Sequence, residues 1–456
     1  MDVLSYLIVF AIILLPLCSF ITRVLKKRSL QLSITLLLLS AILVMFIGLG
    51  MSGAKGTIFN VISINPFSIF FGIVFTAGFL LINIMASEFS DKYENFSLLA
   101  SFALAGMYLV AASNSLITIF LGIEFTTLPS IFIILLSKRS IEAAAKLFIM
   151  AAIAIAVLSF AIVLSYGATN TFSLPQHSTG YFLLFAGILF IASLGFEASI
   201  FPFNVLMPDV YSGSPAFITG MLGGLNKKMG FAAFIQVMIL LLISYHELFY
   251  VVAILSVLTM FYGNLVAIMQ KNVKRMLAYS SISQSGYILI GIAVFGSGGI
   301  AAALVQIFAH TFLFIGLLGI VAWMESKGRT TVDNYIGLNS ESRFAAFSMS
   351  LFMLSLVGLP FTTGFVGKFL LFLSAVNGNL ILLAIFGIIN SIISVYYYVR
   401  VIIAAYTKRY DTRPLRMSRQ LSVILISCIA ITIILGVYPS PLISFAKSAG
   451  AYILAL

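Results

Sequence analysis

Long apolar runs fill most of the chain, and short polar loops separate them. A membrane-spanning helix needs about 20 mostly apolar residues, whereas a membrane-spanning strand gives about ten residues of alternating polarity, a pattern that we do not find here. The sequence therefore predicts an all-α, polytopic membrane protein with about fourteen transmembrane helices. The first run has neither a basic leading segment nor a small-residue cleavage site, so we expect a retained helix. The expected helices cover residues 3–22, 30–50, 66–86, 97–113, 115–136, 143–166, 181–203, 216–242, 248–270, 277–297, 300–324, 343–375, 378–405 and 420–442.

The Lys and Arg residues of the loops are distributed very unevenly. When the loops are numbered along the chain, the odd loops hold 18 of them, and the even loops and the tails hold only Lys55 and Lys447. Positive residues are retained on the cytoplasmic side of a membrane. We therefore expect the odd loops to face the cytoplasm and both termini to lie outside, in the inner (plasma) membrane of a prokaryotic cell. The 18 residues are Arg23, Lys26, Lys27, Arg28, Lys92, Lys138, Arg139, Lys271, Lys274, Arg275, Lys327, Arg329, Arg343, Lys408, Arg409, Arg413, Arg416 and Arg419.

The composition supports a membrane protein and disfavours other classes. Of the 456 residues, 62% are hydrophobic and only 8% are charged. A soluble chain averages about 25% charged residues, so a soluble enzyme, a disordered chain and a nucleic-acid-binding domain are all disfavoured. The net charge of +12 follows from the basic loops, and we expect no nucleic-acid partner.

The cysteines indicate no redox or metal centre on this chain. The sequence contains two, Cys18 and Cys428, and both lie inside apolar runs. There is no Cys-x-x-Cys motif and no Cys/His cluster of the kind that binds zinc, haem or an iron–sulfur cluster. We therefore interpret both cysteines as packing residues and expect neither a bound cofactor nor a metal.

Ionisable residues inside the apolar runs are the strongest candidates for function, because a charge at the centre of a membrane helix costs about 2.5–3.5 kcal/mol on insertion scales. Glu124 is the tenth residue of its run, and Lys227 lies near the middle of another run, directly before Lys228. Adjacent helical residues point about 100° apart. We therefore expect only one of the two lysines to face the interior, and we favour Lys227. The structural alternative for Glu124 is a carboxylate held by a neighbouring lysine.

Two prolines indicate broken helices, which are tolerated inside a membrane where they line a polar cavity. Pro360 lies between glycines, and Lys368 follows it by eight residues, about 12 Å along a helix. Pro202 lies five residues after Glu197. Because a break of this kind lines a polar cavity, Lys368 and Glu197 are further candidates for functional residues.

The two breaks fall in the seventh and twelfth expected helices, five helices apart. An odd offset inverts the topology, so the sequence predicts two inverted five-helix repeats. The expected units are residues 1–96 (helices 1–3), 97–242 (helices 4–8), 243–405 (helices 9–13) and 406–456 (a cytoplasmic loop and helix 14).

Three further residues carry weaker signals. Glu142 and Lys146 are four residues apart and can pair on one helix face, so a structural and a functional role are equally plausible. His310 is intramembrane and can titrate near neutral pH, although a lone buried histidine is more often a hydrogen-bonded packing residue.

A set of such groups suits proton transfer. In a low-dielectric interior a lysine holds its proton less tightly than in water, and an approaching carboxylate strengthens its hold. Moving a carboxylate relative to a lysine therefore switches proton binding. Glu124, Lys227, His310 and Lys368 fall on separate expected helices, which is consistent with a chain of proton carriers linked by water.

At these residues the chain resembles the antiporter-like membrane subunits of respiratory complex I and related proton-pumping dehydrogenases, and most of all the N-type subunit. The resemblance covers about residues 66–407, and the order and spacing of its motifs make it specific. The motifs are Leu121–Glu124, Glu142–Phe148, Pro202–Asn204, Pro208–Pro215, Asn226–Phe231, Val273–Ile282, Gly358–Phe369, Asn390–Ser391 and Tyr396–Arg400.

The resemblance implies a fourteen-helix subunit in the membrane arm of a redox-driven proton pump. It makes Glu124 the acidic partner in helix five, Lys227 the central lysine of helix eight, and Lys368 the exit-side lysine of helix twelve. It implies that flavin, iron–sulfur clusters and quinone are bound by partner subunits. It also implies further antiporter-like subunits, small helical subunits and a peripheral redox arm as partners within the lipid bilayer.

The chain departs from the family pattern at several positions. The family usually has a lysine where Glu197 stands, so the sign of that charge is reversed. It often has histidines where Asn204 and Ser283–Ser285 stand, and His310 has no clear N-type counterpart. At the helix-seven position, either an acid takes the site of the usual lysine, or the pair with Glu124 is rebuilt with Lys227 or Lys228.

Three alternatives remain open from the sequence. A subunit of a multisubunit cation/proton antiporter would share the same charged helices. A stand-alone solute carrier would need a substrate site at the two helix breaks. A purely structural scaffold would leave the costly intramembrane charges unexplained. The electron donor (NADH, reduced ferredoxin or a reduced deazaflavin), the acceptor, and the choice between protons and sodium are not encoded on this chain.

Overall fold

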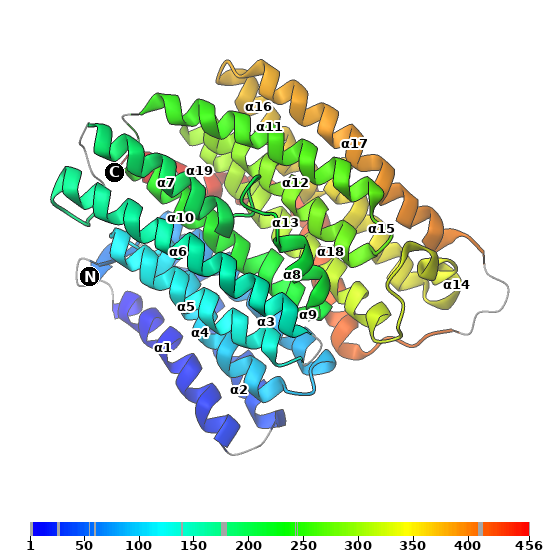
Figure 1. Ribbon diagram of the computed structural model, residues 1–456. Helices are drawn as coiled ribbons and strands as arrows, with labels where there is room; N and C mark the ends of the chain where they lie inside the picture. The colour runs from blue at the N-terminus through cyan, green and yellow to red at the C-terminus, as the bar shows by residue number, and fades with distance from the viewer. Residues whose placement is uncertain are drawn as a thin grey trace.

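The computed structural model describes residues 3–24, 28–53, 55–58, 61–137, 140–174, 180–241, 243, 245–408 and 414–455. Almost all of these residues are helical, and the helices form one elongated bundle (Figure 1). The elements are α1 (Val3–Val24), α2 (Arg28–Ser52), β1 (Gly56–Ile58), β2 (Ile62–Ile64), α3 (Pro66–Phe89), α4 (Tyr93–Ala111), α5 (Leu116–Leu135), α6 (Ile141–Thr169), α7 (Tyr181–Glu197), α8 (Met207–Gly213), α9 (Ala216–Met221), the π-helical turn η2 (Leu222–Asn226), α10 (Lys227–Leu240), α11 (His246–Met269), α12 (Val273–Ala293), α13 (Ser297–Glu325), the 3-10 turn η3 (Val332–Tyr335), α14 (Leu338–Glu341), α15 (Arg343–Val357), α16 (Thr363–Asn377), α17 (Ile381–Tyr406), α18 (Arg419–Val437) and α19 (Ser440–Leu454).

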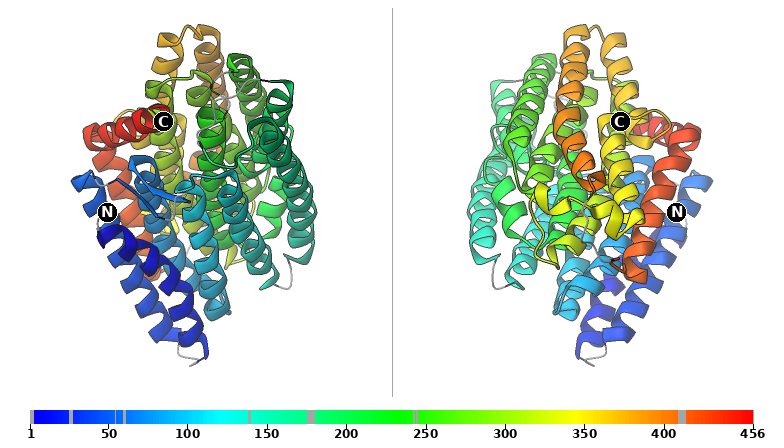
Figure 2. Two further views of the ribbon diagram at one scale, coloured as in Figure 1. Left: turned by 90° about the vertical axis from the view of Figure 1, so that its left-hand side faces the viewer. Right: turned by 90° about the vertical axis from the view of Figure 1, so that its right-hand side faces the viewer.

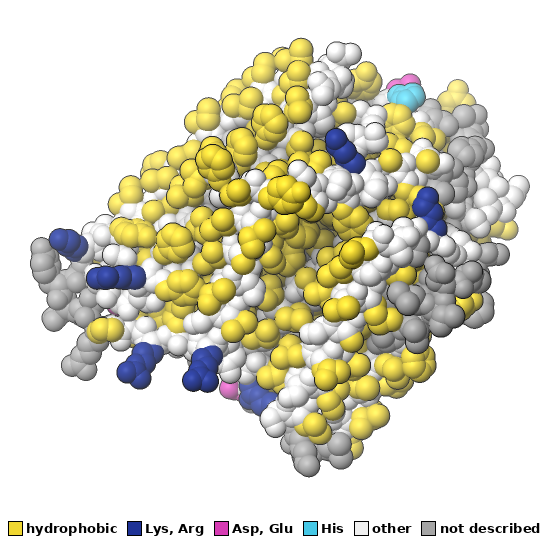
Figure 3. All heavy atoms as spheres, turned by 180° about the vertical axis from the view of Figure 1, so that it is seen from behind, with side chains coloured by type: hydrophobic (Ala, Val, Ile, Leu, Met, Phe, Trp, Pro, Cys, Tyr) yellow, Lys and Arg dark blue, Asp and Glu magenta, His cyan; other side chains and the backbone are white. Residues whose placement is uncertain are grey.

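The outer surface of the bundle is apolar, as a membrane protein requires. Among the described residues, nine helices are long and apolar enough to cross a bilayer. Figure 3 shows hydrophobic side chains over most of one face, with the visible Lys and Arg side chains mainly along two of its edges. The prediction of a polytopic helical membrane protein is therefore confirmed, while the count of fourteen spans and the inverted repeats stay predictions.

The centre of the bundle is α13. Its membrane-spanning window is completely buried, and it packs against α3, α9, α12, α15, α16, α18 and α19. The first and last helices lie on the same side of the molecule: both views in Figure 2 place α1 and α2 beside α18 and α19. Helices from both ends of the sequence therefore enclose α13, and any polar residue on α13 must find its partners inside the protein.

Two glycines set the distance between α4 and α5, the helix that carries Glu124. A Cβ atom at Gly122 of α5 would lie 2.8 Å from the Gly106 carbonyl oxygen of α4, and a Cβ atom at Gly106 would lie 2.6 Å from the Gly122 carbonyl oxygen. Such distances are too short for any side chain. The two backbones are therefore in direct contact, and this contact fixes the turn of α5 that carries Glu124.

Pro202 and Pro360, the two prolines at which breaks were expected, each lie in a gap between two helices. Helix α7 ends at Glu197, so the expected helix over 181–203 is wrong for its last six residues, where turns containing Pro202 lead into the unpredicted helix α8. In the other break, α15 ends at Val357 and α16 begins at Thr363. Gly358 there has φ of 112°, a conformation that glycine adopts without strain.

Two other features were not predicted from the sequence. A short hairpin pairs β1 with β2, and the helix α19 follows α18, where only a tail was expected. Small residues and Lys447 lower the hydropathy of α19, which hid it from a search for apolar runs. Six of the 18 basic loop residues lie outside the described residues, namely Lys26, Lys27, Lys138, Arg139, Arg409 and Arg413.

The contact between α4 and α5 gives a prediction for stability. We expect Gly122→Ala to destabilise the protein by about 1–3 kcal/mol, because the added methyl group overpacks a backbone contact. Gly48→Ala is a suitable control, since a Cβ atom there meets nothing within 4 Å. Thermal unfolding of the detergent-solubilised protein measures both changes. Equal melting temperatures for the two variants would contradict the packing described here.

Candidate functional site

Lys227 is buried at the point where η2 passes into α10. Its side chain is 2% exposed, and its Nζ atom donates to the Ser281 carbonyl oxygen at 2.5 Å and to the Ser281 Oγ atom at 2.9 Å. Ser281 lies on α12. A π-helical turn inserts an extra residue into a helix and recurs at functional sites, and here it sets the direction in which Lys227 leaves the helix.

Lys228 is buried as well, which corrects the expectation that only one of the two lysines faces the interior. It is 0% exposed, and its Nζ atom lies 2.8 Å from His310 Nδ1 on α13. Helix α10 packs against α4, α5, α7 and α13, so two side chains that point about 100° apart both meet protein. His310 is fully buried, and its Nε2 atom has no hydrogen-bond partner in the structure.

Glu197 and Lys227 line one small cavity. The cavity has a volume of about 20 Å³ and is also lined by Tyr211 and Asn226, which leaves room for about one water molecule. The end of α7 contacts α10 directly, because a Cβ atom at Gly230 would lie 2.6 Å from the Glu197 backbone. The structure therefore brings the acid that departs from the family pattern to the lysine at the centre of the site.

Glu124 occupies the rim of this region. Its side chain is partly buried on α5, whose neighbouring residues Leu121, Phe125 and Leu128 are exposed. Helix α5 reaches the cavity through Ser130, whose Oγ atom accepts a hydrogen bond from Asn226 Nδ2 at 2.7 Å. No ion pair joins Glu124 to a basic side chain within the described part of the chain, so the alternative of a carboxylate held by a lysine finds no support there.

Lys368 lies in the second turn of α16, directly after the second break. It is 3% exposed, and its Nζ atom donates to the Val357 carbonyl oxygen at the end of α15 and to the Ser391 Oγ atom of α17, both at 3.0 Å. The ammonium group also lies 4.4 Å from the centre of the Tyr287 ring. The break at Pro360 thus provides a free carbonyl group that a continuous helix would have used internally.

A polar face of α12 lies between the two lysine sites, and the sequence analysis missed it. Ser280 of this face pairs with Tyr398 of α17, and Gln284 pairs with Gln306 of α13 at 2.8 Å. A run of serines and glutamine inside an apolar helix was the available signal. Because the sequence does not show the partners on α13 and α17, the run indicates only a transmembrane helix of low hydropathy.

Glu142 and Lys146 belong to a different group of charges. Lys146 lies 2.7 Å from Glu142 and 3.0 Å from Asp209, and Asp209 also lies 2.9 Å from Arg275. The Glu142 side chain is 81% exposed. This network joins α6, α8 and α12 at the surface, which favours the structural interpretation of the Glu142–Lys146 pair.

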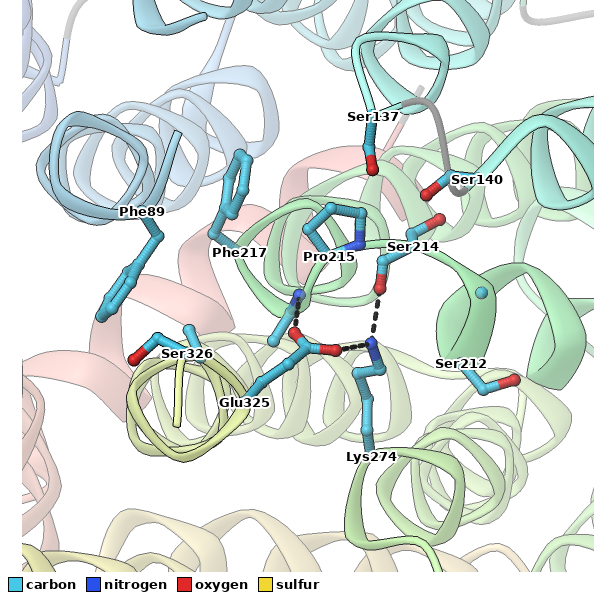
Figure 4. Close-up of a pocket in the computed structure, with 13 residues that line it drawn as sticks. Phe89, Ser137, Ser140, Ser212, Ser214, Pro215, Phe217, Lys274, Glu325 and Ser326 are labelled. Carbon is cyan, nitrogen blue, oxygen red and sulfur yellow. Dashed lines mark hydrogen bonds and ion pairs between the residues drawn. The ribbon is translucent and has the colours of Figure 1, made fainter. Parts of the chain in front are cut away.

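A larger pocket, of about 300 Å³, contains another ion pair that the sequence did not single out (Figure 4). Lys274 Nζ lies 2.5 Å from Glu325 Oε1 and donates to the Ser214 carbonyl oxygen at 2.6 Å. Glu325 Oε2 accepts from the Ala216 backbone N–H at 2.8 Å. The pair therefore holds the link between α8 and α9, where the helical segment that leads to Lys227 begins.

A second ion pair fixes the connection after α13. Both Nη atoms of Arg329 donate to the carboxylate of Glu341, which is 6% exposed. The hydrogen bonds to the neighbouring carboxylate raise the pKa of the Arg329 guanidinium. Among the described residues, no group of three or more His, Cys, Asp or Glu side chains could hold a metal ion.

The fold and the buried charges define a polytopic membrane subunit of the antiporter-like class, and comparison with known families agrees. Residues 113–394 match the model of the family described as "NADH:quinone oxidoreductase/Mrp antiporter, TM". The chain belongs to this family.

Curated relatives carry the N-type designation. The chain is 34% identical to F(420)H(2) dehydrogenase subunit N of Methanosarcina mazei over 420 residues, 86% of this chain and 85% of the relative. It is also 34% identical to NADH-quinone oxidoreductase subunit N of Moorella thermoacetica, over 88% of both chains. The resemblance to N-type antiporter-like subunits is thereby confirmed.

Solved structures share the fold along nearly the whole chain. A chain of respiratory complex I from Thermus thermophilus matches with a TM-score of 0.84 and 25% identity, over 96% of this chain and 99% of that chain. A chain of the Mrp complex from Dietzia sp. matches with a TM-score of 0.92 and 18% identity, over 99% and 98%. The latter likeness concerns the fold alone.

The pair in the larger pocket gives a prediction for stability. Lys274→Met should destabilise the protein by about 1–3 kcal/mol, because Glu325 loses its charged partner; the 32% exposure of the Glu325 side chain keeps the loss at the lower end. The double variant Lys274→Met/Glu325→Gln should recover part of it. Thermal unfolding measures the cycle, with Lys271→Met at an exposed position as the control, and strictly additive effects would contradict a direct interaction.

Proposed function

We propose that this chain is a proton-translocating, N-type antiporter-like subunit in the membrane arm of a complex I-like dehydrogenase. The observation that carries the proposal is the burial of three lysines, Lys227, Lys228 and Lys368, without an ion pair within the described residues. Each ammonium group is held by neutral oxygen, nitrogen or aromatic groups. Such an arrangement tolerates loss of the proton, whereas a structural ion pair needs the charge.

The proposed route begins at Glu124 and passes Glu197. The cavity shared by Glu197 and Lys227 has room for a water molecule that can exchange a proton between them. Lys228 and His310 then extend the route to α13, and Lys368 ends it at the second break. Glu197 thus acts as an acid beside Lys227, in the place where the family usually has a lysine. Glu142 and Lys146 do not lie on the route and serve only to hold α6 against α8.

The names of the relatives support the complex in which we propose that this chain works. Those named NADH-quinone oxidoreductase subunit N and F(420)H(2) dehydrogenase subunit N support a complex whose other subunits bind flavin, iron–sulfur clusters and a quinone-type carrier, with NADH, reduced ferredoxin or a reduced deazaflavin as donor. Membrane-arm partners are further antiporter-like and small helical subunits. In the proposed topology, fourteen spans include two inverted repeats, and both termini lie outside the plasma membrane.

Two other functions remain as alternatives. The likeness of the fold to a chain of the Mrp complex favours a subunit of a multisubunit cation/proton antiporter as the second candidate. A stand-alone solute carrier is disfavoured, because the relatives are named as subunits of NADH-quinone oxidoreductase and F(420)H(2) dehydrogenase.

Loss of either of two central groups should reduce pumping. We expect Lys227→Ala and Glu124→Ala each to lower the rate of proton uptake by membrane vesicles at least about tenfold, since removal of a positioned proton donor or acceptor costs about 10²–10⁴-fold in rate. Assembly of the complex should persist. Lys447→Ala, at an exposed position on α19, is the control. Wild-type pumping by both assembled variants would refute the route.

The reversed charge at position 197 allows a separate test. Glu197→Gln should lower pumping, because an amide does not exchange protons. Glu197→Lys should lower it further, since a second cation beside the same cavity disfavours the protonated form of Lys227. Vesicle acidification measures both variants. Normal pumping by Glu197→Lys would mean that this position accepts either sign of charge and that Glu197 has no specific role.

A further inference from the structure

Two buried glutamines connect the two halves of the polar interior. Gln306 of α13 donates from Nε2 to the Oε1 atom of Gln284 of α12 at 2.8 Å, and both residues are 1% exposed. This hydrogen bond joins α12 to α13 inside the bundle, away from the Lys274–Glu325 pair at the ends of the same two helices. His310 is the next residue along the same face of α13, one turn after Gln306.

The position of Gln306 relative to Lys368 is fixed by a glycine. Any side chain at Gly367 of α16 would collide with the Oε1 atom of Gln306. Gly367 directly precedes Lys368, so the amide oxygen lies against the turn of α16 that carries the lysine. Gln306 therefore precedes His310 by one turn of α13, and its amide oxygen lies against Gly367, the residue before Lys368.

Each amide keeps one group without a hydrogen-bond partner. These groups are Gln284 Nε2, a donor, and Gln306 Oε1, an acceptor. Gln284 faces the Tyr398 hydroxyl without making a hydrogen bond of normal geometry to it. Buried polar groups are nearly always satisfied by protein or by ordered water, so a free donor and a free acceptor at one place indicate bound water.

We propose that Gln284 and Gln306 are positioning residues that hold water between His310 and Lys368, so that protons cross this step on water and not on a titrating side chain. The inference rests on the proposed function. An amide neither gains nor loses a proton near neutral pH, but it fixes the orientation of a water that accepts from Gln284 Nε2 and donates to Gln306 Oε1. The pair therefore carries no proton itself and determines whether a water chain forms.

Substitutions in the assembled complex test this role. Gln284→Leu and Gln306→Leu should each lower proton pumping at least about tenfold, because misplacing a group by about 1 Å costs up to about 10²-fold. Gln236→Leu is the matched control. Gln236 is equally buried on α10, binds the carbonyl oxygens of Val110 and Ala111, and also has an unpaired Oε1 atom, but it lies off the line to Lys368.

Gln306→Glu adds a second measurement, the pH dependence of pumping, which would not change if Gln306 served only in packing. The protonated carboxyl group keeps a donor and an acceptor, so pumping should approach the wild-type rate at low pH. As the pH rises and the carboxyl group ionises, its charge beside Lys368 should hold the proton there and pumping should fall. An unchanged pH profile for this variant, or wild-type pumping by both leucine variants, would overturn the proposal.

Lys368→Met separates this inference from the proposed function. If Lys368→Met abolishes pumping while the glutamine variants pump normally, the bridge is wrong and the function stands. If Lys368→Met also pumps normally, the proposed function itself fails. A cryo-EM map of the complex that shows ordered water gives an independent answer. Density within hydrogen-bonding distance of Gln284 Nε2 and Gln306 Oε1 is expected, and a dry site would overturn the bridge.

Discussion

Every charged or polar group inside this bundle must find its partner within the protein, because hydrocarbon offers none. The structure meets this constraint at Lys227, Lys228 and Lys368 by bringing neutral partners from distant helices to each of these lysines. Lys227 uses a serine of α12, Lys228 uses His310 of α13, and Lys368 uses the open end of α15. The glycine contacts and the helix breaks all serve these meetings, since a partner group must approach closely before it can replace water.

Helix α13 contacts the surroundings of both lysine sites. It is enclosed on all sides, and it carries His310 toward α10 and Gln306 toward α12 and α16. Neighbouring turns of one helix thus contact groups that belong to separate parts of the sequence. A displacement of α10 or α16 would change the surroundings of both lysine sites through this helix, which is the coupling that a proton-translocating subunit needs.

Apolar runs and isolated charges were sufficient to predict the membrane class and to select Glu124, Lys227 and Lys368. These signals are local, because the sequence of one apolar run is enough to identify a charged residue that is costly to place in a membrane. The burial of Lys228 and the meeting of Glu197 with Lys227 were not predictable in this way. Both depend on which helices pack around α10, and the partners of the two lysines lie 54 and 82 residues away along the chain.

Isolation of the native assembly tests the central claim most directly. Membranes are extracted in mild detergent, and the mass and absorbance spectrum of the particle that carries this chain are measured. The account predicts a particle much larger than the 49.5 kDa chain, with flavin and iron–sulfur absorbance. A large colourless assembly would point to a cation/proton antiporter, and a particle of the mass of this chain alone would contradict a role as a subunit of any complex.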